Sequence, residues 1–155
     1  MAIIMKLTLH NESDTYEFAH QLAQCTQLVN SCIVIYLEGD LGVGKTTFAR
    51  GFIQFYGFDQ VKSPTYSLVE SYINDKVNIH HFDCYRLGDA QELEYIGIRE
   101  YLAPGHIQLI EWAELGKGMI APTDMIIRIT DHLDKHELQI TTHTQVGNQL
   151  LACIN

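Results

Sequence analysis

Short apolar runs alternate along the chain with longer stretches in which apolar residues recur at helical spacing. Runs of four to eight such residues, bounded by polar and turn-forming positions, are typical of strands in a buried sheet. Strands are expected at residues 3–9, 33–38, 66–73, 77–83, 107–112, 125–129 and 137–142. Asn74-Asp75-Lys76 lies between the third and fourth runs and predicts a hairpin turn.

Helical spacing is found in three places. Asp14, with Glu17 three residues later, has the pattern of a helix start. Residues 46–56 place three phenylalanines on one stripe and are followed by Gly57, a typical helix end. Residues 89–101 predict a third, continuous helix, and the tail after residue 142 is ambiguous.

Composition describes one globular unit. The chain has 155 residues, of which 46% are hydrophobic and 19% charged, which is enough for a full α/β core. No apolar run approaches the roughly 18 residues of a membrane-spanning helix, and the N-terminal segment is too short for a signal peptide. We therefore expect a cytoplasmic protein with no membrane contact.

The net charge of −9 disfavours strong direct nucleic-acid binding, because neutralising phosphates requires a basic face.

The four cysteines do not form a C-x-x-C pair. This spacing suggests neither a zinc site nor a disulfide framework. The expectation is therefore four reduced, mostly buried thiols, at Cys25, Cys32, Cys84 and Cys153.

The main chemical signal is a glycine-rich segment directly after the apolar run at 33–38. Residues 39–46 fit the phosphate-loop pattern G-x-x-x-x-G-K-[ST], in which glycines let backbone N–H groups point at phosphates. Lys45 would bind the β- and γ-phosphates, and the Thr46 hydroxyl would bind Mg²⁺. The predicted fold is therefore α/β, a single P-loop NTPase domain over residues 1–155, with a mixed, mostly parallel central sheet flanked by helices. The expected nucleotide-binding residues are Gly39, Asp40, Leu41, Gly42, Val43, Gly44, Lys45, Thr46 and Thr47.

Hydrolysis also needs an acid near the metal and a group that responds to the γ-phosphate. Asp83 and Glu111 each close an apolar run, so both could emerge at the sheet edge where open α/β folds bind ligands. Thr65, in the Ser63-Pro64-Thr65 loop, could complete the Mg²⁺ shell.

Four blocks of the sequence resemble the bacterial TsaE (YjeE) family in order and spacing. They are GDLGVGKTT at 39–47, SPTYSLVE at 63–70, HFDCYRL at 81–87 and IEW at 110–112. The resemblance implies the ATPase subunit of the machinery that forms threonylcarbamoyladenosine in tRNA next to the anticodon, acting with TsaD and TsaB.

The same resemblance implies ATP and Mg²⁺ as cofactors and feeble turnover without the partner proteins. It assigns catalytic roles to Lys45, Thr65, Asp83 and Glu111, and metal roles to Thr46, Asp83 and Glu111. Whether Asp83 or Glu111 dominates metal handling stays open. Trp112 beside Glu111 is either core packing or a residue that responds to nucleotide or partner.

Other functions remain in competition. A small-metabolite or nucleoside kinase has the same loop, but the chain lacks the clustered arginines of a kinase lid. A nucleotide-sensing adaptor without essential hydrolysis is harder to distinguish from an ATPase subunit. A GTPase is disfavoured because N-K-x-D is absent. No arginine finger is evident, although Arg86 lies close to Asp83 in sequence.

The residues that hold the base are not fixed by any motif. The segments 11–14 and 131–135 could flank it.

Overall fold

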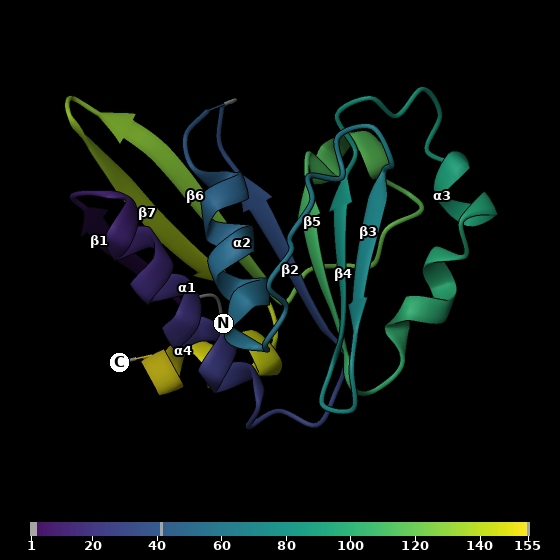
Figure 1. The fold of residues 1–155 in the computed structure, drawn as a ribbon, viewed down its shortest axis with the longest axis horizontal. Helices are drawn as coiled ribbons and strands as arrows, with labels where there is room; N and C mark the ends of the chain where they lie inside the picture. The colour runs from purple at the N-terminus through teal and green to yellow at the C-terminus, as the bar shows by residue number, and fades with distance from the viewer. Residues whose placement is uncertain (1–2, 41, 155) are drawn as a thin grey trace.

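Seven strands form one mixed sheet in the computed structural model, which describes residues 3–40 and 42–154 (Figure 1). In spatial order they run β1-β7-β6-β2-β5-β4-β3. The central pairs β2–β5, β2–β6 and β4–β5 are parallel, and the outer pairs are antiparallel. The strands are β1 Ile4–Leu9, β2 Ile33–Glu38, β3 Val69–Ile73, β4 Asn78–Asp83, β5 His106–Glu111, β6 Met125–His132 and β7 Lys135–Thr142.

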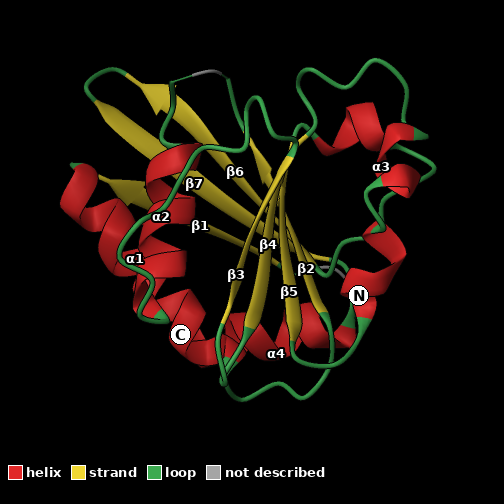
Figure 2. Cartoon of the chain, turned by 45° about the vertical axis from the view of Figure 1, so that its right-hand side comes forward, coloured by secondary structure: helices red, strands yellow, loops and turns green. Residues whose placement is uncertain are grey.

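Helices cover both faces of this sheet, as Figure 2 shows. The larger layer contains α1 (Glu12–Thr26), α2 (Lys45–Phe55) and α4 (Gln145–Ile154). The opposite layer contains α3 (Glu92–Tyr95) and the 3₁₀ turns η1 (Ile98–Leu102) and η2 (Ala113–Gly116). This arrangement confirms the predicted α/β class.

Alternation along the central strands decides which residues face α2. Successive side chains in a strand point to opposite faces, so β2 buries Ile35 in the layer of α2 and Val34 in the opposite layer. In β4, Ile79 belongs to the α2 layer, so His81 and Asp83, two and four residues later, face the same layer. In β5, Leu109 also belongs to this layer, and Glu111 follows two residues later. Asp83 and Glu111 therefore both lie on the face of the sheet that α2 covers.

Two helix predictions need correction. The first helix begins at Glu12, because the Asn11 side chain accepts a hydrogen bond from the Asp14 N–H at 2.9 Å and caps it. Asp14 is therefore a first-turn residue, whose carboxylate accepts from the N–H of His10. The continuous helix expected at 89–101 is wrong: Gly97 has φ +79°, a left-handed conformation that separates α3 from η1.

The strand predictions hold apart from their ends. The expected run 66–73 is shorter, because Leu68 has φ +71° and β3 starts only after it. Likewise β5 ends at Glu111, since Trp112 has φ +57°. The hairpin turn is confirmed, with the Asn74 side chain accepting from the N–H groups of Lys76 and Val77.

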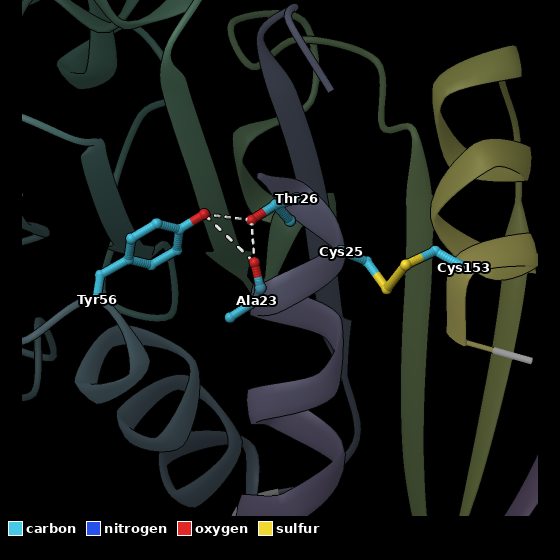
Figure 3. Close-up of a disulfide and its surroundings, with 5 residues drawn as sticks. All are labelled: Ala23, Cys25, Thr26, Tyr56 and Cys153. Carbon is cyan, nitrogen blue, oxygen red and sulfur yellow. Dashed lines mark hydrogen bonds between the residues drawn. A yellow bond between two sulfur atoms is a disulfide. The ribbon is translucent and has the colours of Figure 1, made fainter. Parts of the chain in front are cut away.

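The expectation of four reduced cysteines is wrong. Cys25 in α1 and Cys153 in α4 form a disulfide (Figure 3). Cys32 and Cys84 are free thiols. The two bridged residues are 128 positions apart in sequence, and only the packing of α4 on α1 brings them together. A spacing rule for local pairs cannot find such a bridge.

None of the helices within residues 3–40 and 42–154 has the length and apolarity needed to span a membrane.

A polar cluster lies under η1 on the face away from α2. His80 is 1% exposed, bonds to Ser71 Oγ at 2.8 Å and to His106 Nδ1 at 2.9 Å, and stacks on Tyr101 at 3.9 Å. Gln108 donates to the Tyr101 carbonyl from the same side. Burial, and then the neighbouring His106, lower the pKa of His80 to about 4.

This cluster predicts acid sensitivity. Below pH 6.5 the unfolded chain protonates residue 80 while the folded protein does not, so stability falls as pH falls toward 4. Between pH 7.5 and 5, His80 should account for a loss of about 2 kcal/mol, measured by urea unfolding. His80→Gln should flatten the profile relative to wild type, whereas the matched change at exposed His132 should not. Identical profiles for wild type and His80→Gln would contradict the assignment.

Candidate functional site

The loop between β2 and α2 is shaped for close approach of an anion. α2 starts after Gly44, whose φ is +109°, and no side chain of the described residues caps it. By contrast, α1 has a side-chain cap at Asn11. The first N–H groups of a helix lack partners within the helix and carry its positive dipole end, so the start of α2 is an anion site left open.

Lys45 places a cation at this helix start. Lys45 is buried, with 5% of its surface exposed, and its Nζ donates to the Gly39 carbonyl at 2.7 Å. Nζ also lies 4.2 Å from the centre of the Trp112 ring. Within residues 3–40 and 42–154 no carboxylate lies within ion-pair distance of Lys45. A buried cation without a counter-charge is costly, which fits a site that receives an anionic ligand.

Two buried carboxylates stand beside each other at the carboxyl ends of β4 and β5. Asp83 pairs in register with Glu111, and the two residues are 8% and 4% exposed. Asp83 Oδ1 accepts from the Tyr85 N–H at 3.0 Å. Glu111 Oε2 accepts from His81 Nε2 at 2.6 Å, because a carboxylate oxygen can only accept. The predicted pair of acids is therefore assembled at one sheet edge.

The Ser63-Pro64-Thr65 loop contacts this edge. Thr65 Oγ1 donates to Asp83 Oδ2 at 3.3 Å and is 2.7 Å from Ser63 Oγ. The Leu68 N–H closes the loop on the Pro64 carbonyl, and the Leu68 carbonyl in turn accepts from the Asp83 N–H. The loop is thus linked to the acid both by a side chain and by the backbone.

The remaining predicted loop residues differ in position. Thr46 is exposed at the first turn of α2, and no hydrogen bond joins it to Asp83 or Glu111 in the described part of the chain. Val43 is buried against Gly39, and its N–H donates to the Asp40 carbonyl. Leu41 lies outside the described residues.

Two clefts flank the loop. The larger, about 570 Å³, is lined by Lys45, Trp112, the Glu38–Arg128 ion pair and residues 129–131 of β6. The smaller, about 250 Å³, lies toward β1 and β7. Its lining includes Asn11, Glu12, Gly42, Gly44, Thr47, Asp134 and His136. The two segments expected to flank a base, 11–14 and 131–135, therefore meet in one cleft, and that role stays a prediction.

Sequence reasoning missed two histidines near the site. His81 is 1% exposed and bonds to Glu111 through Nε2. Its Nδ1 has no hydrogen-bond partner among the described residues. His136 lies near Gly44 and 3.1 Å from Asp131 across the β6–β7 hairpin. The signal for His81 was its position two residues before Asp83, which puts both on one face, but the partner Glu111 follows only from the β4–β5 register.

The residues present fit a polyphosphate with a divalent cation. An open helix start and a buried lysine suit phosphate oxygens, and the Thr46 hydroxyl with two carboxylates offers the oxygen ligands that Mg²⁺ prefers. Asp83 and Glu111 are buried side by side, so a divalent cation between them would have two oxygen ligands from the protein.

Comparison with known proteins gives a consistent family. Residues 9–140 match the family described as "Threonylcarbamoyl adenosine biosynthesis protein TsaE". The protein of that name from Haemophilus influenzae is 43% identical over 124 residues, covering 79% of this chain and 78% of the relative. The one from Aquifex aeolicus is 34% identical over 143 residues, covering 90% and 96%. The crystal structure of Bacillus subtilis YdiB superposes with a TM-score of 0.77 and 26% identity, over 99% of this chain and 95% of that one.

Gly39 should be the least replaceable residue of the loop. Its φ is +143°, and a Cβ there would lie 2.4 Å from the backbone oxygen of Ile129, whereas Gly42, with φ +85°, has open space around it. Gly39→Ala should therefore cost more than about 3 kcal/mol of unfolding free energy, and Gly42→Ala about 1 kcal/mol. Urea unfolding of both variants measures this, and equal losses would show that the contact with β6 is not limiting.

Proposed function

The chain belongs to the TsaE family, and on that premise we propose that it binds and hydrolyses ATP in the formation of threonylcarbamoyladenosine in tRNA. Its fold is that of a P-loop NTPase, like that of YdiB. TsaD and TsaB are the proposed partners. The relatives' name supports the pathway, and the loop, lysine and acids described above support the chemistry.

One observation supports the proposal most strongly: Lys45 is buried at the uncapped start of α2 without a carboxylate partner among the described residues. Its ammonium group is held by the Gly39 carbonyl and the Trp112 ring. Both contacts are weaker for a cation than an ion pair with phosphate would be, so binding ATP would offset the cost of burying the charge. Backbone N–H groups of the loop would bind the remaining phosphate oxygens.

The metal side of the proposal rests on Thr46, Asp83 and Glu111. When bound, Mg²⁺ would neutralise charge that develops on the phosphate oxygens. His81 holds one oxygen of Glu111, which fixes the carboxylate and leaves Oε1 without a hydrogen bond among the described residues. Glu111 would use this oxygen to orient a water molecule, and Asp83 would position the Thr65 loop through their hydrogen bond.

Thr65 would act as the nucleotide-dependent switch. Its hydroxyl bonds to Asp83, and the loop that carries it continues into Tyr66, which is 85% exposed. Arg86 lies 4.5 Å above the ring of Tyr66 and so borders the same loop. A change in the contact between Thr65 and Asp83 would therefore be transmitted to an exposed surface where a partner protein can respond.

Weak turnover without partners follows from the arginines. Each of the four contacts another side chain: Arg99 pairs with Glu94, Arg50 bonds to Tyr16, Arg128 pairs with Glu38 in the larger cleft, and Arg86 covers Tyr66 beside the Thr65 loop. None of the four therefore stands free to stabilise charge on the γ-phosphate in the described structure. A group contributed by TsaD or TsaB would complete the site, and an acidic chain need not contact tRNA itself.

The base would occupy the smaller cleft. Asp83 and Glu111 lie on the β5–β4 side of β2, whereas this cleft lies on the β7–β1 side of the same loop. A nucleotide whose phosphates follow the loop, with the metal side toward the acids, would extend its nucleoside toward Asn11 and His136.

Replacing Lys45 tests the binding proposal. Lys45→Ala should weaken ATP binding roughly 10- to 100-fold in the presence of Mg²⁺, because a charge-assisted hydrogen bond to phosphate is lost. Titration calorimetry measures the affinity. Lys76→Ala is the matched control, since it removes the same charge from the exposed turn between β3 and β4. Equal affinities for wild type and Lys45→Ala would refute the site.

Replacing the acids tests catalysis separately from binding. Glu111→Gln should keep ATP affinity within a few fold but lower phosphate release in the presence of TsaD and TsaB by about 100-fold or more. Asp83→Asn made in parallel shows which acid handles the metal, because the dominant one should shift the Mg²⁺ concentration needed for half-maximal rate. Unchanged hydrolysis by Glu111→Gln would reduce Glu111 to a structural role.

A further inference from the structure

The disulfide between Cys25 and Cys153 joins two helices near opposite ends of the chain (Figure 3). The two cysteines of this bridge differ in exposure. Cys25 is 4% exposed, whereas Cys153 is on the surface of α4. A thiol in solution would therefore reach Cys153 Sγ before it reaches Cys25 Sγ.

Both cysteines line an open surface pocket of about 390 Å³. Its other lining residues are Gln21, Gln24, Gln27, Leu28 and Ile154. None of these side chains is acidic, although the chain as a whole has a net charge of −9. The attacking species in disulfide exchange is a thiolate, so a neutral, amide-lined pocket permits its approach where an acidic surface would repel it.

The two helices depend on the bridge to different degrees. At the end of α1, the Thr26 hydroxyl donates to the Ala23 carbonyl and also bonds to the Tyr56 hydroxyl, which ties α1 to the end of α2 (Figure 3). The start of α4 is tied as well, by Thr144 Oγ1 to Asp124 and by Asn148 to Thr142.

The end of α4 has no such polar contacts. Within the described chain, residues 149–154 make no side-chain hydrogen bond or ion pair. Beyond the disulfide, apolar packing is what holds this end of α4 to the rest of the protein. Leu150 and Leu151 are 0% and 2% exposed in that packing. Opening the bridge would therefore loosen the last turns of α4 and leave α1 in place.

We propose that Cys153 is a thiol-modification site at which a small peptide thiol of the glutathione class opens this disulfide. The thiolate attacks Cys153 Sγ and forms a mixed disulfide, while Cys25 leaves as a thiolate and takes up a proton in its buried position. A second thiol then releases Cys153 as a free thiol and leaves as half of an oxidised dimer. In sum, one protein disulfide is reduced by two electrons and two small thiols are oxidised to one disulfide.

The proposal does not depend on the nucleotide site, and the experiment keeps the two apart. Oxidised protein is incubated in glutathione buffers of graded redox ratio, quenched with acid and alkylated after unfolding. Oxidised protein should show two alkylated thiols, at Cys32 and Cys84, and reduced protein four. At intermediate ratios, peptide mapping should locate one glutathionyl group on Cys153. Four thiols before reduction, or the group on Cys25, would overturn the proposal.

The structural consequence is measured by hydrogen exchange. Amides of residues 149–154 should exchange at least about tenfold faster in the reduced protein, while those of α1 keep their rates. Closing a loop of this length should also raise the melting temperature of the oxidised form by roughly 10 °C. Cys153→Ser should behave as the reduced protein in every buffer, and Cys32→Ser should respond as wild type. Equal exchange in oxidised and reduced protein would refute the role of the bridge.

MgATP affinity should be the same in both redox states, because α1 stays bonded to α2. Loss of ATP binding in both states would contradict the proposed function and leave the disulfide proposal intact. Loss in the reduced state alone would show that α1 moves with α4, which would overturn the inference that opening the bridge loosens α4 and leaves α1 in place.

Discussion

The ammonium group of Lys45 is the constraint around which the site is arranged. It lies inside the protein at the open end of a helix, with a backbone carbonyl and an aromatic ring as its neighbours. Burying such a group is costly unless its neighbours compensate for the lost water. Two contacts fix the described ends of this loop: the backbone of Gly39 packs on β6, and Val43 is buried. The lysine thus depends on the central sheet for its position.

The same sheet brings the acids to the lysine. Strands β2, β5 and β4 are parallel, so their carboxyl ends meet at one edge, and alternation places Asp83 and Glu111 on the α2 side of that edge. Burial on both faces makes these strands insensitive to small changes of sequence at the surface. His81 then adds a fixed donor to Glu111. The geometry of the site is therefore largely a property of strand register.

This dependence explains which features could be predicted from the sequence. The phosphate loop follows from a local pattern, and the apolar runs predict the strands with errors only at their ends. Local patterns offer Asp83, Glu111 and Thr65 as candidates, but the resemblance to the TsaE family selects them, and their roles stay predictions. The broken helix around Gly97 could not be predicted, because a single left-handed residue outweighs a good helical pattern. The His81–Glu111 contact and the Cys25–Cys153 bridge join residues 30 and 128 positions apart, so they depend on tertiary structure that no local spacing encodes.

Helix α1 connects the phosphate loop to the disulfide. Its start lines the smaller cleft beside the loop, and its end carries Cys25. Gly51 of α2 lets the two helices approach closely, since a Cβ there would lie 2.8 Å from Tyr16 and 3.1 Å from Ala19. Close packing of this kind couples the position of α1 to that of α2. Chemistry at Cys153 therefore acts on α4 alone, because α1 is fixed along its length by α2 rather than by the bridge.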